Sequence, residues 1–192
     1  MTDPTTRISS PETDWLKHYY SLRFAVAALW AAAAFAVGRE PAAAAAMLLI
    51  AYPAWDAFAN YLDARRSGGL AANAMQATNA AISLATAAAV ALALGQDMAT
   101  VLAVFGIWAI VAGLLQLGAA VRRWRRSGAQ WVMVLSGAQS ALAGGFFLAR
   151  AYRDGASAVE MIAGYAAIGA LYFLISALWL FGSAWWRGRT PA

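Results

Sequence analysis

The sequence contains no cysteine and a single histidine, His18. The absence of cysteine excludes a disulfide framework, a thiolate metal site and a thiol nucleophile. His18 precedes the first apolar stretch and has no second histidine with which to share a metal ion. We therefore expect His18 to be a membrane-surface residue, and we expect neither a metal nor a cofactor.

Charge is also scarce, because charged residues make up 12% of the chain and hydrophobic residues 62%. A typical soluble domain is about 25% charged. A soluble chain of this size could not bury so many apolar side chains. In a membrane protein they need no burial, because they can face lipid. The apolar runs are continuous and rich in alanine, without the alternation of a membrane β-barrel. The composition thus predicts an all-α membrane protein.

Six apolar stretches are close to the length of a membrane-spanning helix. A hydrocarbon core about 30 Å thick requires roughly 20 apolar residues. The first stretch is shorter and would need Tyr19, Tyr20 and Arg23 to snorkel at one end. We therefore predict a polytopic protein with a partly disordered cytoplasmic tail (1–20), a transmembrane domain (21–186) and a cytoplasmic C-terminal tail (187–192). The six predicted helices are 22–37, 42–62, 71–94, 98–120, 130–149 and 158–181.

The positive charges favour one orientation. If both termini are cytoplasmic, the outer loops hold only Arg39, Arg150 and Arg153 of the 14 basic residues. Acidic residues divide evenly, so the bias is specific to lysine and arginine, as the positive-inside rule requires. The basic connector predicts contact with anionic lipid headgroups rather than nucleic acid, since it is a short loop between two spans. Its arginines are Arg122, Arg123, Arg125 and Arg126.

Short sequence similarities suggest that the helices repeat in pairs. Similar tripeptides lie in the second, fourth and sixth predicted helices, at 50–52, 105–107 and 163–165. Ser83 precedes the second tripeptide, and Ser140 the third, at nearly the same spacing. Because a pair of helices preserves orientation, this pattern predicts three parallel two-helix hairpin repeats about an axis along the membrane normal.

The segment 131–145 follows the pattern W-x-x-x-L-x-G-x-x-S-x-x-x-G, and 106–117 has paired glycines around an apolar core. These two segments resemble consecutive helices of the HdeD-like family, and the similarity is best over 70–181. The resemblance implies a small, six-helix protein of the bacterial inner membrane, named after a member linked to acid resistance. It implies a location and an architecture more than a reaction.

Small residues at four-residue spacing predict close helix packing, as in Gly137/Ala141, Ser140/Gly144 and Ala163/Ala167. Helices in lipid associate through close packing and polar contacts, because lipid tails are as apolar as leucine. Packing within the bundle is the main interpretation, and a homo-oligomer is the alternative. The expected packing residues are Gly106, Gly113, Gly137, Gly144 and Gly164.

Polar side chains gather in the predicted cytoplasmic half of the helices. This uneven distribution indicates either interhelical hydrogen bonds that hold the helices in register or a water-filled vestibule. The residues of this polar layer are Tyr52, Asp56, Asn60, Asn73, Gln76, Asn79, Gln116, Gln139 and Ser140.

Asp56 is the main candidate for a functional site, because a carboxylate within a span is costly. Arg23 is the nearest candidate cation by depth. A structural pairing of Asp56 with Arg23 or an asparagine is one interpretation, and a proton or cation site is the other. On the structural interpretation, Asp56→Asn should leave stability nearly intact.

The sequence shows no recognisable set of catalytic residues, and we do not expect the protein to be an enzyme. No set of nucleophile, base and orienting residue is present, and there is no glycine-rich phosphate loop. Two functions remain: a structural or stress-linked membrane protein, and a small transporter or channel that uses Asp56. The apparent lack of a second charged site favours the first.

Overall fold

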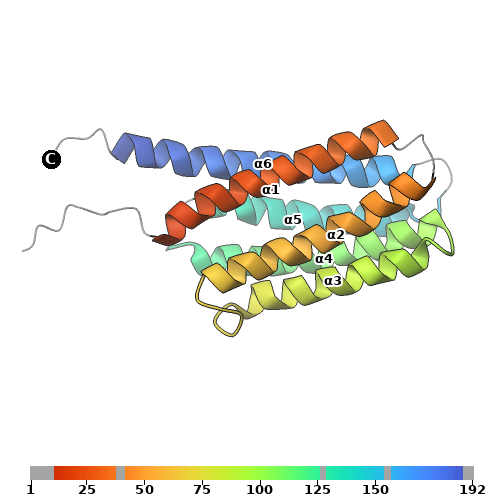
Figure 1. Cartoon of the computed structure of the whole chain (residues 1–192), viewed down its shortest axis with the longest axis horizontal. Coiled ribbons are helices and arrows are strands. Elements are labelled where there is room, and N and C mark those ends of the chain that lie inside the picture. The colour runs from red at the N-terminus through yellow and green to blue at the C-terminus, as the bar shows by residue number, and fades with distance from the viewer. Residues whose placement is uncertain (1–10, 38–41, 126–128, 154–156, 188–192) are drawn as a thin grey trace, which may run out of the picture.

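The computed structural model describes residues 11–37, 42–125, 129–153 and 157–187, and this part of the chain forms six helices without a strand. The helices are α1 (Pro11–Val37), α2 (Ala42–Arg66), α3 (Ala74–Ala93), α4 (Met98–Arg123), α5 (Gln130–Arg150) and α6 (Ala158–Arg187). All six run along the long axis of the molecule, so the α2–α3 loop and the α3–α4 turn lie at opposite ends (Figure 1). The all-α class is confirmed.

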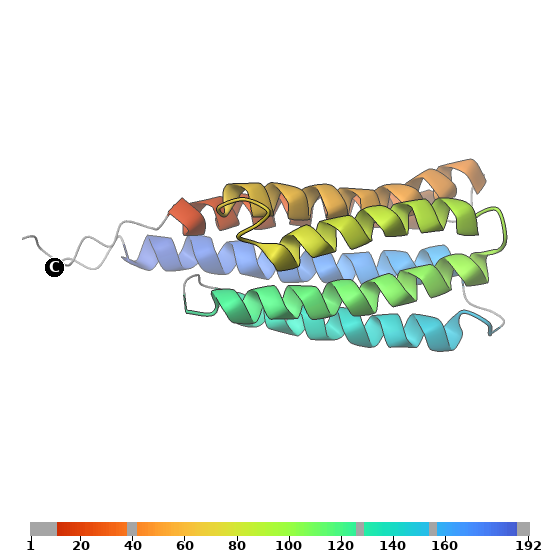
Figure 2. The ribbon, with the colours of Figure 1, turned by 90° about the horizontal axis from the view of Figure 1, so that it is seen from below.

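Five of the helices are long and apolar enough to cross a membrane, namely α1 and α3 to α6. The described part of α2 does not reach this hydropathy, although the helix is 25 residues long. Its C-terminal half carries Asp56, Asn60 and Asp63, and it ends in Arg65 and Arg66. α2 nevertheless runs beside the other helices along the bundle, as two perpendicular views agree (Figures 1 and 2).

Three helix boundaries differ most from the predicted ones. α1 begins at Pro11 rather than at 22, since its first turns bury Leu16, Tyr19 and Tyr20 against neighbouring helices. α2 continues to Arg66, so Asp63 lies in a helix and not in a connector. α6 continues to Arg187. Hydropathy placed the start of α1 too late and the ends of α2 and α6 too early, because polar residues interrupt the apolar runs at these positions.

The helices form a closed ring in which each one packs against the next and α1 returns to α6. The most extensive contacts are between α4 and α5, between α1 and α6, and between α2 and α3. These pairs lie between the predicted hairpin repeats rather than within them. The predicted threefold repeat has partial support from two hydrogen bonds. One bond joins Trp108 to Ser83 and the other joins Tyr165 to Ser140, and in each the two residues are 25 positions apart.

Glycines allow α4 and α5 to approach closely. A Cβ atom added to Gly113 would lie 2.6 Å from the carbonyl oxygen of Gly137, and one added to Gly137 would lie 2.7 Å from that of Gly113. Gly106 and Gly144 form a second contact of this kind. Gly164 does not have the expected packing role, because no described atom lies within 4 Å of an added Cβ. Its position in α6 faces open space.

The turn between α3 and α4 is stabilised by a helix cap. The side chain of Asp97 accepts a hydrogen bond from the backbone N–H of Thr100 at 2.6 Å. This bond, together with the Thr100 hydroxyl, lowers the pKa of Asp97 below its ordinary value. The carboxylate also suits the positive end of the α4 dipole.

Cysteine labelling can test which loops share a side of the membrane, since the chain has no native cysteine. We expect Leu70→Cys and Arg125→Cys to react with a membrane-impermeant maleimide from one side. Gln96→Cys and Tyr152→Cys should react only from the other side, because the helices between these exposed positions run the length of the bundle. Labelling of Leu70→Cys and Gln96→Cys from the same side would show that α3 does not cross.

Candidate functional site

Two apolar clusters fill the two ends of the bundle, and polar side chains lie between them. Along α2, Tyr52 packs against the first cluster and Ala59 belongs to the second, with Asp56 between them. Along α4, Gln116 lies in the same way between Ala112 and Ala120. The polar layer is therefore an interior layer of the bundle rather than a surface feature.

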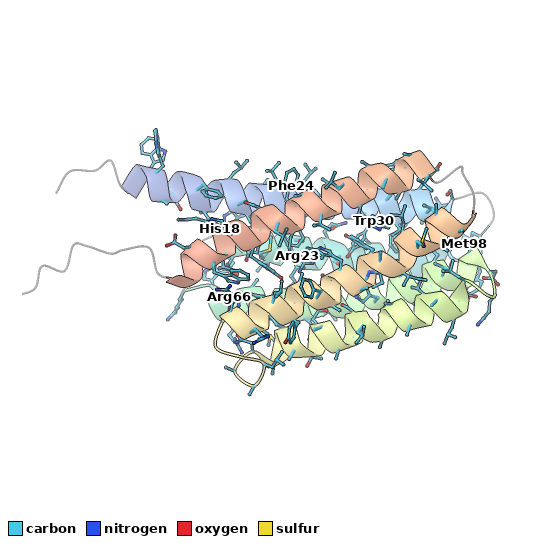
Figure 3. All side chains as sticks on the ribbon, viewed as in Figure 1. His18, Arg23, Phe24, Trp30, Arg66 and Met98 are labelled. Carbon is cyan, nitrogen blue, oxygen red and sulfur yellow. The ribbon has the colours of Figure 1, made fainter. Side chains whose placement is uncertain are left out.

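Asp56 is the centre of the first polar network. Arg23 of α1 forms an ion pair with the Asp56 carboxylate and also donates to the hydroxyl of Tyr19 at 3.1 Å. Figure 3 shows Arg23 between α1 and α2. Asn60 and Ser83 donate to the other carboxylate oxygen of Asp56, at 3.0 and 2.8 Å.

The partners of Asp56 are held in place in turn. The guanidinium of Arg23 lies over the ring of Phe173, 4.4 Å from its centroid, which is within cation–π range. The indole N–H of Trp108 donates to the hydroxyl of Ser83 at 2.9 Å. We call Arg23, Asp56, Asn60, Ser83 and Trp108 the Asp56 network. It joins α1, α2 and α3 at one carboxylate and reaches α4 through the hydrogen bond from Trp108 to Ser83.

Asp63 is the centre of a second network, which the sequence reasoning missed. Asp63 is 3% exposed, and Arg123 of α4 donates to its carboxylate at 2.8 Å. Trp15 and Gln76 also donate to this carboxylate, at 3.1 and 3.4 Å. The expected lack of a second charged site was therefore wrong. The Asp63 network consists of Trp15, Asp63, Ser67, Gln76 and Arg123.

The arginines of the basic connector have different environments. Arg123 is 8% exposed, and its guanidinium is bound to Asp63 and Ser67. Arg122 donates to the side chain of Asn73 at 2.8 Å, while Arg125 is exposed. Arg126 lies outside the described residues. Burial therefore makes Arg123 a structural partner of α2 rather than a residue exposed to lipid headgroups.

Asn73 does not join the rest of the predicted polar layer. Its amide donates to the backbone oxygens of Ser67 and Gly69 at 2.7 and 3.0 Å, so it stabilises the loop between α2 and α3. This loop also contains Gly68 and Gly69, both with positive φ. Asn73 therefore has a local role in the turn.

Two small cavities lie beside the two networks. The Asp63 cavity has a volume of about 50 Å³, and the Asp56 cavity one of about 40 Å³. Arg23, Asn79, Gln116 and Phe173 line both cavities. The Asp56 cavity takes in most of the predicted polar layer, namely Tyr52, Asp56, Asn79, Gln116, Gln139 and Ser140. Asn60 and Gln76 line the Asp63 cavity.

Four buried polar atoms have no hydrogen-bond partner in the described part of the protein. They are Nε of Arg23, Oε1 of Gln76, Oδ1 of Asn79 and Oγ of Ser176. The first three belong to residues that line the cavities. Within the described ranges, no three histidine, cysteine, aspartate or glutamate side chains come together as a metal site.

Comparison with known proteins gives one partial match to a family model. Residues 78–149, from α3 to α5, match the model of a short repeat of unknown function, DUF308. This is a family of membrane proteins, and HdeD-like proteins contain it. The match covers the α4–α5 pair with its close glycine contacts. No curated protein and no solved structure matches the chain.

Proposed function

We propose that this protein is a non-enzymatic integral membrane protein with a structural role. The observation that carries the proposal is the environment of Asp56, the one predicted ion site. Donors from α1, α2 and α3 engage its carboxylate, through Arg23, Asn60 and Ser83. A carboxylate whose charge is already matched by arginine has little affinity for a transported cation. Asp56 then serves to hold helices together.

The proposal includes an orientation in the bacterial inner membrane, with both termini in the cytoplasm. The end of the bundle that contains the α2–α3 loop also holds Arg65, Arg66, Arg122 and Arg125, whereas the opposite end holds Arg150 and Arg153. This bias is the positive-inside pattern. Exposed Arg122 and Arg125 would then face anionic headgroups of the inner leaflet.

A link to stress forms a further part of the proposal, and it is supported by the resemblance to HdeD-like proteins and the DUF308 match. A homo-oligomer is compatible with the exposed apolar face of α6, which includes Leu171, Leu178 and Trp179. Neither part depends on a reaction at Asp56.

A small transporter or channel that uses Asp56 as a proton or cation site is the alternative. The two cavities and their unpartnered polar atoms favour it, because such groups line hydrated pathways in transporters. Asp56 lines one of these cavities.

Purified protein in liposomes that contain a pH-sensitive dye separates the two functions. After an imposed pH gradient, we expect proteoliposomes with the wild type and with Asp56→Asn to lose the gradient no faster than protein-free liposomes. An ionophore added at the end confirms that the dye responds. Faster dissipation with the wild type, lost in folded Asp56→Asn, would reject the structural proposal and establish the transporter.

A further inference from the structure

Asn79 occupies a special position in the bundle, because its side chain lines both cavities. The residue is 6% exposed, and its Oδ1 atom has no partner in the described part of the protein. Gln76, which is 4% exposed, has a second unpartnered oxygen, Oε1, and lines the Asp63 cavity. Its amide nitrogen donates to Asp63, which fixes the orientation of the amide group. A buried carbonyl-type oxygen without a hydrogen bond is costly, so a ligand that donates hydrogen bonds is expected here.

The charges around the cavities select the class of ligand. Arg23 lines both cavities, and Arg123 lines the Asp63 cavity, so a cation would lie beside a guanidinium. An anion would face the carboxylate of Asp63 and the amide oxygens of Gln76 and Asn79. A neutral group that both donates and accepts fits these requirements, because it also accepts from Nε of Arg23.

The volumes of the two cavities limit the size of the ligand. A water molecule needs roughly 10–15 Å³ of this kind of volume and two to four polar partners. Cavities of about 50 and 40 Å³ exceed this minimum several-fold, so each has room for more than one water molecule. The lining side chains are buried or half-buried, so these molecules would be held inside the protein.

We propose that the two cavities bind a chain of water molecules that passes Asn79 and joins the Asp56 network to the Asp63 network. The water completes the hydrogen bonds of Asn79, Gln76 and Arg23. It also connects the two buried ion pairs, Arg23–Asp56 and Arg123–Asp63. This inference does not rest on the structural role proposed above, because bound water can be detected whether or not the protein conducts protons.

Nuclear magnetic resonance of the full chain in lipid nanodiscs can test the proposal. The side-chain amides of asparagine and glutamine are labelled with ¹⁵N, and contacts with water are recorded by rotating-frame Overhauser transfer. The sign of the transfer separates bound water from proton exchange. We expect long-lived water contacts at Asn79 and Gln116, which line both cavities, and also at Gln76 and Gln139, which line one cavity each. The signals of Asn79 are identified by their loss in Asn79→Leu.

Asn73 is the internal control, because it is 3% exposed and donates to loop carbonyl oxygens away from the described cavity linings. It should show no long-lived water contact. The absence of such contacts at Asn79 would overturn the proposal. Water contacts at Gln76 but not at Gln139 would contradict the proposed chain of water molecules, since water would then occupy the Asp63 cavity without reaching Asp56.

Discussion

Asp56→Asn should lower the free energy of unfolding by about 3–5 kcal/mol, since removal of one partner leaves a buried charge without compensation. The arginine and aspartate side chains of this pair are only 13% and 10% exposed. Asparagine can still accept from Ser83, but it cannot neutralise Arg23. The expectation from the sequence that this substitution would be nearly neutral is therefore revised. The measurement is the unfolding of wild type and variant in the same detergent, monitored by the loss of the helical circular dichroism signal.

The double variant Arg23→Met/Asp56→Leu should recover most of this loss, because a buried ion pair replaced by apolar residues of similar volume is often neutral or stabilising. Asp14→Asn provides a control at an ion pair whose carboxylate is exposed. Lys17 and Asp14 are 2.7 Å apart, but the Asp14 side chain is 49% exposed. Such pairs contribute about 0–1 kcal/mol. A double variant less stable than Asp56→Asn would show that Arg23 is not the charge that Asp56 compensates.

The sequence predicted the class of the fold and the Arg23–Asp56 pair for physical reasons that are easy to state. Long apolar runs with little charge can be accommodated only by helices in lipid. Arg23 and Asp56 lie at similar depth on helices that are consecutive in the chain, and the structure pairs them. Local patterns and depth were sufficient for these features.

The Asp63 network could not be predicted in the same way, because hydropathy treats an acid near arginines as the end of a span. Asp63 lies seven residues after Asp56, which places both on the same face of α2. That spacing was the available signal. Its partner Arg123 is 60 residues away in the sequence, and only the ring of helices brings α4 beside this end of α2.

The glycine predictions agree with the structure where glycines of two facing helices match, and they were wrong for Gly164 of α6, which faces no other glycine. Gly106 and Gly113 of α4 are matched by Gly144 and Gly137 of α5, at equal spacing along two antiparallel helices. Gly164 of α6 has no such counterpart near it. A small residue permits a close approach, but the facing helix decides whether the approach occurs.

Substitution of Gly144 should therefore have a large effect that is absent one residue later. An added Cβ at Gly144 would meet the carbonyl oxygen of Gly106 and would lie 2.8 Å from the backbone nitrogen of Ile110. Since both atoms belong to the backbone of α4, the two helices would have to separate. We expect Gly144→Ala to cost about 1–3 kcal/mol, as is typical of overpacking, and Gly144→Leu to lower the folded yield in detergent further.

Gly145 is the matched control, because it lies in the same turn of α5 and no described atom is within 4 Å of its added Cβ. Gly145→Ala should be neutral or stabilise α5 by up to about 1 kcal/mol, because alanine has the higher helix propensity. The unfolding midpoints of both variants in one detergent decide the question. Equal losses at the two positions would mean that flexibility of α5 matters rather than its contact with α4. A loss at Gly144 that Gly145 does not share would locate the close contact on the face of α5 that meets Gly106 and Ile110.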